Sequence, residues 1–266
     1  MPAPETGCDA QMTGLRVTVS VDDGHPLDLK VAALLARHGL RATFYLPVRN
    51  REGPPVLSGA QARALAERFE IGAHTLSHRF LAGLDAGTAW REIDEGKRAL
   101  EDRLGRPVHG FCYPGGRYRR THVRQVQAAG FHFARTTQNL CMTPGASVYE
   151  MATSAQFYPH TRAVWLRNFV SQRDWRARAP ALHAVWRAPD WQARLAALLA
   201  LAHARSGVFH LWLHALDIER LHLWASLDRF LARLAASTPA DGRVTNGELL
   251  MPVATGSSTP SGNNAT

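Results

Sequence analysis

Two short polar segments contain residue types that could hold a metal ion and move a proton. Asp22 and Asp23 form an aspartate pair directly before Gly24. His74 and His78 lie four residues apart, a spacing that on one helical turn lets both imidazoles point at the same metal ion. One aspartate with two histidines would form a three-ligand zinc site with an open position for water, and the second aspartate would be free to act as a base.

Each segment also has a simpler interpretation when it is taken alone. An aspartate pair before a glycine is common at a turn or a helix cap. Two histidines at this spacing also arise by chance. The metal site is favoured because the two segments together supply a complete set of ligands.

The segment 111–116, with the sequence FCYPGG, follows a predicted strand. Its glycines allow a tight loop, so the backbone N–H of Gly115 could face a ligand as part of an oxyanion hole. Tyr113 is a candidate substrate contact in the same loop. An ordinary strand-ending turn is the alternative.

The last apolar run, 209–214, ends in a histidine. His214 could protonate a leaving group, and Asp217 lies close enough in the chain to orient it. Trp212 is a candidate substrate contact. A lone histidine at a strand end is more often structural, but this one is the fourth polar element expected at one edge of the fold.

The elements that must position these residues follow from hydrophobic periodicity, which alternates between β-branched runs and helical spacing. Strands are expected at 16–21, 42–46, 70–73, 108–112, 131–135 and 208–213, and helices at 26–39, 59–69, 86–104, 121–129, 191–205 and 219–235. Such alternation predicts an α/β fold with a parallel sheet. Six or seven units favour a distorted, incomplete (β/α) barrel over an open doubly wound sheet, with the site at the carboxyl ends of the strands.

The chain is expected to form one domain over residues 15–250, with a flexible N-terminus at 1–14 and a polar, disordered tail at 251–266. The stretch 136–190 has weak periodicity and is expected to be an irregular region that carries recognition. His160 and Trp165 within it are candidate substrate contacts. A buried helix segment would explain the apolar run 163–170 almost as well.

Composition limits the class of protein further. The 266 residues are 45% hydrophobic, which is typical of a globular chain, and the net charge of +9 comes almost entirely from arginine. The arginines recur along predicted helices near glutamates, so no nucleic-acid partner is expected. The chain shows neither a signal-peptide pattern nor a membrane span, which predicts a cytoplasmic protein. Without a CxxC spacing, Cys8, Cys112 and Cys141 are expected to be free thiols.

The polar segments, in this order, resemble the polysaccharide deacetylase family, also called the NodB-homology family or carbohydrate esterase family 4. Residues 20–24 match its first motif, 74–78 its second and 211–214 its fifth, and the resemblance spans roughly residues 16–235. It implies a metal-dependent N-deacetylase on a distorted barrel. The roles it implies are Asp22 as general base, Asp23, His74 and His78 as ligands of zinc or another divalent metal, and His214 as general acid.

The chain departs from the family's pattern at the third and fourth motifs. Cys112 stands where the family has an arginine that braces the catalytic aspartate, and Gly115 stands where an aromatic residue is usual. The only candidate for the fourth motif is the pair Asp174 and Trp175. These departures concern the tuning of Asp22.

The expected substrate is a small glycoside or glycoconjugate that contains N-acetylglucosamine. Among relatives that act inside cells, the chain looks like the deacetylases that tailor glycopeptide antibiotics of the teicoplanin type. The apolar and aromatic run 163–170 would suit an aromatic peptide acceptor. Two alternatives come from other classes: a catalytically inactive carbohydrate-binding relative, and an amidase or imidase acting on a nitrogenous small molecule.

Overall fold

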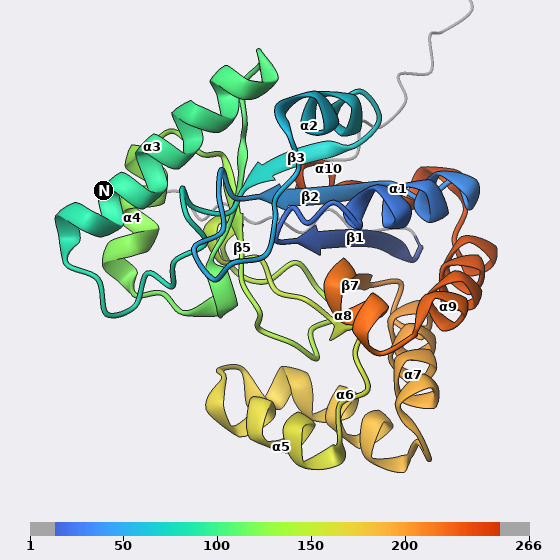
Figure 1. Ribbon diagram of the computed structural model, residues 1–266. Coiled ribbons are helices and arrows are strands. Elements are labelled where there is room, and N and C mark those ends of the chain that lie inside the picture. The colour runs from blue at the N-terminus through green and yellow to red at the C-terminus, as the bar shows by residue number, and fades with distance from the viewer. Residues whose placement is uncertain (1–13, 251–266) are drawn as a thin grey trace, which may run out of the picture.

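The computed structural model of the chain describes residues 14–250 (Figure 1). The tail predicted at 251–266 and all but the last residue of the N-terminus predicted at 1–14 lie outside these residues, as does Cys8. The strands are β1 (Arg16–Asp22), β2 (Ala42–Leu46), β3 (Glu70–Ala73), β4 (Gly110–Cys112), β5 (Phe133–Arg135), β6 (Ala155–Gln156) and β7 (Val208–His214). The α-helices are α1 (Asp28–Arg37), α2 (Gly59–Ala66), α3 (Ala86–Leu104), α4 (Arg120–Ala128), α5 (Arg162–Ser171), α6 (Trp175–Arg187), α7 (Trp191–Ala204), α8 (Ala215–Arg220), α9 (Trp224–Ser237) and α10 (Asn246–Leu249). Short 3-10 turns occur at Pro114–Gly116, Val148–Glu150 and Ala240–Gly242.

The seven strands form one parallel sheet in the order β5-β4-β3-β2-β1-β7-β6. The sheet curls, and the helices lie around its outside (Figure 1). This arrangement confirms the predicted α/β class and the incomplete (β/α) barrel.

Apolar and polar side chains alternate along β1, and this alternation determines which side chains lie on the inner side of the curled sheet. Val17, Val19 and Val21 belong to the main hydrophobic core. Because successive strand side chains point to opposite faces, the polar residues between these valines face the other side of the sheet. There Ser20 Oγ lies 2.8 Å from Nε2 of the buried His210 on β7. The inner side of the sheet is therefore partly polar, and it leads toward the aspartates at the end of β1.

The segment 151–156, whose last two residues form the edge strand β6, also contacts β5 at the opposite edge of the sheet. Met151 forms a parallel bridge with Arg135 at the end of β5. Four residues later, Ala155 on β6 pairs with Leu211 on β7. The segment 151–156 thus connects the two ends of the curled sheet.

The sequence predicted an irregular region at 136–190. This prediction is wrong, because the stretch contains the helices α5 and α6. Its periodicity is weak because the buried face of α6 combines Ala181 and Val185 with an arginine, Arg178, and because Pro180 lies inside the helix. The Arg178 guanidinium is fully buried and donates to backbone carbonyls, including those of Asn139 and Phe169. Hydrogen bonding here replaces the apolar contacts that sequence periodicity detects.

The helix expected at 219–235 is also wrong in extent, because two helices, α8 and α9, occupy this part of the chain. His222 between them has a φ of 54°, in the left-handed region that a continuous helix cannot contain. α8 starts directly after β7, so it places its residues beside the end of that strand.

Two further expectations concern thiols and membranes. Cys112 and Cys141 are free thiols in the structure, as predicted. Between residues 14 and 250, no helix has both the length and the apolar character required to cross a bilayer.

Candidate active site

A cavity of about 320 Å³ lies at the carboxyl ends of β1, β3 and β7. Sheet register explains why residues distant in the chain meet there, because Asp22 at the end of β1 is the direct partner of His214 at the end of β7. Of the residues singled out in the sequence, eight line the cavity: Asp22, Asp23, His74, His78, Gly115, Trp212, His214 and Asp217.

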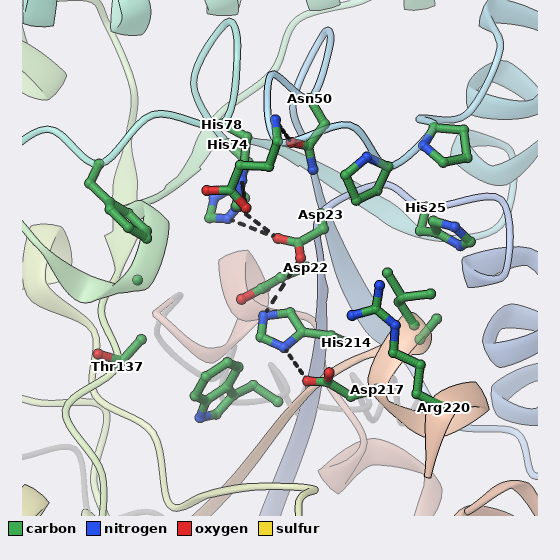
Figure 2. Close-up of a pocket in the computed structure, with 18 residues that line it drawn as sticks. Asp22, Asp23, His25, Asn50, His74, His78, Thr137, His214, Asp217 and Arg220 are labelled. Carbon is green, nitrogen blue, oxygen red and sulfur yellow. Dashed lines mark hydrogen bonds and ion pairs between the residues drawn. The ribbon is translucent and has the colours of Figure 1, made fainter. Parts of the chain in front are cut away.

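Asp23, His74 and His78 are arranged as potential metal ligands. Their donor atoms lie within 4.8 Å of one another. Oδ1 of Asp23 is 3.6 Å from Nε2 of His74 and 3.0 Å from Nε2 of His78, and Figure 2 shows both rings turned toward this carboxylate. Although burial by itself raises the pKa of Asp23, the neighbouring histidines lower it well below its ordinary value. The cluster therefore presents a carboxylate together with two imidazoles.

The two histidines converge through a turn and not through the helical turn that their spacing had suggested. Thr75 and His78 have φ values of 65° and 57°, both in the left-handed region, so the segment cannot be helical. The buried side chain of Glu92 on α3 holds this turn, because its carboxylate accepts hydrogen bonds from the backbone N–H and the hydroxyl of Ser77 at 2.9 and 2.6 Å. The strained turn is stabilised from a rigid helix.

Packing of α3 against this turn requires a glycine. A Cβ at Gly96 would lie 2.6 Å from the backbone nitrogen of Leu76. Since neither backbone can yield easily, Gly96 sets how closely α3 approaches the turn between the two histidines.

A backbone contact on the side away from Asp23 also orients the His74 ring. Its Nδ1 lies 2.9 Å from the carbonyl oxygen of Cys112, which leaves Nε2 to face Asp23. Asp22, His74 and Cys112 form a second cluster of potential ligand atoms. In that cluster Nδ1 of His74 is already engaged, and burial raises the pKa of the Cys112 thiol well above its ordinary value. The cluster around Asp23 is therefore the better candidate for a metal.

His214 has the geometry of a proton donor. Its Nδ1 is 3.0 Å from Oδ2 of Asp217 on α8, and its Nε2 is 3.9 Å from Oδ2 of Asp23 (Figure 2). Burial by itself lowers the pKa of His214, but the hydrogen bond to Asp217 and the charges of Asp23 and Asp22 raise it to about 9. The imidazolium form therefore persists at neutral pH.

Arg135 is a site residue that the sequence interpretation missed. Its guanidinium is fully buried and donates a hydrogen bond to Oδ1 of Asp22. The guanidinium carbon lies 5.3 Å from the ring centroid of Tyr45 and 5.1 Å from that of Trp212. Cys112 is the sheet partner of Arg135, so the arginine stands one strand away from the place where the family's brace was expected. The one available signal was a charged residue at the end of a buried strand.

At Gly115, too, a residue from another part of the chain lies where the family has a different side chain. A Cβ at Gly115 would meet the Phe80 ring at 2.8 Å, and both residues line the cavity. The Arg117 guanidinium carbon lies 4.7 Å from the centroid of the same ring. Phe80 thus supplies an aromatic surface beside the position where the family's aromatic residue was expected.

Other candidate residues lie away from the cavity lining. Tyr113 is buried and donates a hydrogen bond from its hydroxyl to the carbonyl of Tyr149. Trp165 is buried in α5. His160 reaches the site indirectly, since its Nε2 lies 2.8 Å from Oε1 of Gln156, whose Nε2 lies 3.4 Å from Nδ1 of His214.

The pair proposed for the fourth motif also lies elsewhere. Asp174 accepts a hydrogen bond from Gln138 at 3.0 Å, and Trp175 is 56% exposed. Neither lines the cavity. The aromatic cover of the Arg135 guanidinium comes from Tyr45 and Trp212 instead.

Comparison with solved structures identifies proteins of similar architecture. The chain is 18% identical to a family 4 acetyl xylan esterase from Clostridium thermocellum in complex with a cobalt ion, with a TM-score of 0.54 over 88% of this chain and 89% of that chain. It is 15% identical to T48 deacetylase with substrate, with a TM-score of 0.53 over 89% of this chain and 90% of that chain. At these identities the likeness concerns the fold.

A shorter alignment relates the chain to the Streptococcus pyogenes deacetylase PplD in complex with acetate, at 19% identity and a TM-score of 0.46. It covers 51% of this chain and 62% of PplD, which is less than two thirds of that protein. No curated protein matches the chain significantly.

The family comparison covers the part of the chain that contains the potential metal ligands. Residues 10–134 match the family model described as polysaccharide deacetylase. The match includes Asp22, Asp23, His74 and His78 and ends one residue before Arg135. The matched part of the chain, which carries the ligand cluster on a curled parallel sheet, is similar to the polysaccharide deacetylase family.

Proposed function

We propose that the protein is a metal-dependent N-deacetylase that hydrolyses the acetamide of an N-acetylglucosamine-containing glycoconjugate to a free amine and acetate. The observation that carries this proposal is the meeting of a potential ligand triad, a braced aspartate and a histidine–aspartate pair in one cavity. The similarity of residues 10–134 to the polysaccharide deacetylase family model supports the same reaction class.

The chemistry of the residues fits a divalent metal, most simply zinc. Asp23, His74 and His78 offer one carboxylate oxygen and two imidazole nitrogens, the donors that catalytic zinc sites use while leaving a position open. Oδ1 of Asp23 is buried and accepts no hydrogen bond of good geometry in residues 14–250, although Nε2 of His78 lies only 3.0 Å away. Contact between Nδ1 of His74 and the carbonyl of Cys112 is the outer support that ligating histidines generally have. A bound divalent ion would supply Lewis acidity toward water and the acetyl carbonyl.

Asp22 is the proposed general base. The Arg135 guanidinium engages Oδ1 of Asp22 and fixes the plane of the carboxylate, while the residue still lines the cavity. Asp22 can therefore take a proton from the attacking water without turning away from it. The backbone N–H of Gly115 is the proposed donor to the developing oxyanion.

His214 is the proposed general acid. An amine leaves poorly unless it is protonated, and the His214 imidazolium can deliver that proton from Nε2. Asp217 holds Nδ1 and so keeps Nε2 directed toward the site. The proposed base, Asp22, and the proposed acid, His214, are thus direct partners in the sheet.

For the acceptor we propose a glycoconjugate such as a glycopeptide antibiotic intermediate. Trp212 and Phe80 line the cavity and offer apolar faces on which a sugar ring can stack. Exposed apolar side chains on α5 and α6, including Leu166, Val170 and Trp186, suit an aromatic peptide.

The test combines acetate release with metal analysis. The purified chain, loaded with zinc, should release acetate from N-acetylglucosamine conjugates, and removing the metal with a chelator should stop release until zinc is restored. Sugar binding without acetate release would favour the inactive carbohydrate-binding alternative. Hydrolysis of small cyclic imides in place of acetylated sugars would favour the amidase or imidase alternative.

A further inference from the structure

Arg220 stands on one wall of the cavity, at the end of α8. Asp217 and Arg220 are three residues apart on this helix, so both lie on the same face, and both line the cavity. Figure 2 shows the Arg220 side chain extending into the cavity on the side of His25. The chain therefore places a permanent positive charge beside the proposed reaction centre.

The other charged groups of the cavity already have partners. The contacts are Asp22 with Arg135, Asp23 with His74 and His78, Glu52 with His78, and Asp217 with His214. Within residues 14–250, no carboxylate lies within 4.0 Å of the Arg220 guanidinium and no side-chain hydrogen bond engages it.

The neighbouring carboxylate does not compensate this charge. Glu219 accepts a hydrogen bond from the indole of Trp224 and lies 4.0 Å from Nζ of Lys30. Arg220 is thus the one charged cavity residue, among those that the structure describes, whose donors are all available to a ligand.

His25 adds a second donor to the same wall. Its Nδ1 accepts a hydrogen bond from the backbone N–H of Leu27 at 3.2 Å. Since Nδ1 is the acceptor, the ring proton of the neutral form resides on Nε2, which can donate. His25 lines the cavity together with Arg220.

We propose that Arg220, assisted by His25, binds an anionic substituent of the substrate, so that the preferred substrate is an N-acyl sugar carrying a carboxylate or a phosphate. The inference rests on the proposed function and specifies its substrate class. A guanidinium fork and an imidazole N–H match the oxygen geometry of either anion. The anion would sit on the α8 side of the cavity, away from Glu52, which contacts His78.

Direct binding of deacetylated sugars tests this proposal without requiring turnover. Calorimetry on the zinc-supplemented protein would compare glucosamine 1-phosphate, muramic acid and the neutral methyl glucosaminide, all of which carry the same free amine. We expect at least one of the two anionic sugars to bind more tightly than the neutral sugar. Arg220→Gln should weaken anionic binding by about tenfold or more, because a charge-assisted hydrogen bond is lost, and leave neutral binding unchanged.

Two further variants sharpen the comparison. Arg220→Lys keeps the charge but not the fork and should lose part of the anionic preference. Arg229→Gln removes an arginine on α9, outside the cavity, and should leave every affinity unchanged.

Dependence on Arg220 for the phosphate sugar alone, or for the carboxylate sugar alone, supports the proposal and identifies the anion. Equal affinities for all three sugars, or equal loss in Arg220→Gln for anionic and neutral sugars, would overturn it. Acetate release by the wild-type protein, measured separately, decides the proposed function, so the two failures can be told apart.

Discussion

Arg135 at the end of β5 and Asp22 at the end of β1 form a buried ion pair between residues 113 positions apart in the chain. The guanidinium is fully buried and lies over the rings of Tyr45 and Trp212, so it has little freedom to turn. The position of the proposed base thus depends on a strand that is not its neighbour in the sheet.

Loss of this pair should destabilise the protein as well as inactivate it. Arg135→Met leaves the Asp22 carboxylate buried without its partner and should lower the free energy of unfolding by about 3–5 kcal/mol. Denaturant unfolding measures this, and the double variant Asp22→Asn/Arg135→Met should lose less than the sum of the two single variants. Additive losses would show that the two side chains are not coupled.

Metal content separates the proposed ligands from the base. His74→Ala, His78→Ala and Asp23→Ala should each abolish zinc binding in a folded protein, because each removes one of three protein ligands. Asp22→Asn should retain zinc and lose turnover. Equal zinc in the wild type and in the histidine variants, measured by elemental analysis, would contradict the ligand assignment, and full activity in Asp22→Asn would contradict the assignment of the base.

His214→Ala should reduce amide hydrolysis by roughly 10²–10⁴-fold with little change in zinc content, because proton donation to the amine is lost. An aryl acetate ester has a good leaving group, so its hydrolysis should fall much less in the same variant. Equal losses for amide and ester would mean that His214 positions the substrate or supports the fold.

The pH profile gives a second test of His214. The proton needed for the leaving amine is lost as pH rises through the pKa of His214. That pKa is about 9 before a bound metal ion offsets the charge of Asp23, so kcat of the loaded enzyme should fall on the alkaline side at or below pH 9. Asp217→Asn removes the hydrogen-bonded charge that raises this pKa and should move the fall to lower pH. An unchanged alkaline limb in Asp217→Asn would assign it to another group.

Gly96→Ala tests whether α3 controls the metal ligands without touching them. The new Cβ would clash with the backbone at Leu76, so the turn between His74 and His78 must shift, and zinc affinity should fall. Gly87→Ala in the same helix is the matched control, because its Cβ would meet only a side-chain oxygen of Asp85 at 3.4 Å. Equal zinc affinities in the two variants would remove the role assigned to Gly96.

Acid should destabilise the protein partly through His210. Burial, with the charge of Arg135, lowers its pKa to about 3, whereas the unfolded chain titrates near 6.5. The unfolded state therefore binds the extra proton between these values. This contribution to stability is complete above pH 6.5 and is lost as pH falls, by up to about 1.4 kcal/mol per pH unit. Unfolding free energies of wild type and His210→Gln, measured from pH 7 to 4, should differ in slope, and parallel curves would refute this contribution.

The sequence was sufficient to place together those candidate residues whose positions depend on single strand ends. Asp22, Asp23, His74, His78 and His214 each lie at or just after the end of a strand with a clear pattern, and parallel strands bring their carboxyl ends to one edge. The local conformation at His78 was less accessible, since a histidine spacing of four fits both a helix and a strained turn.

Arg135 and α6 show what the sequence could not reveal. The partner of Arg135 depends on sheet order and register, which no local pattern around residues 131–135 encodes. The helix α6 escaped prediction because Arg178 on its buried face is satisfied by carbonyl groups and not by apolar contacts. Polar groups with long-range partners are the part of this fold that hydrophobic periodicity does not detect.

Contact of the segment 151–156 with both β5 and β7 also covers backbone groups that an open sheet would expose. The outer strand of an open sheet presents unpaired N–H and C=O groups that can template aggregation. Here the N–H of Met151 donates to Ala134 on β5, and the N–H of Ser154 donates to His210 on β7. The N–H of Leu140 donates to the carbonyl of Ser154 from the other side. Addition of a strand from a second molecule at this place would first require the segment to detach, so the residues that join the two ends of the sheet also protect these strands from strand addition.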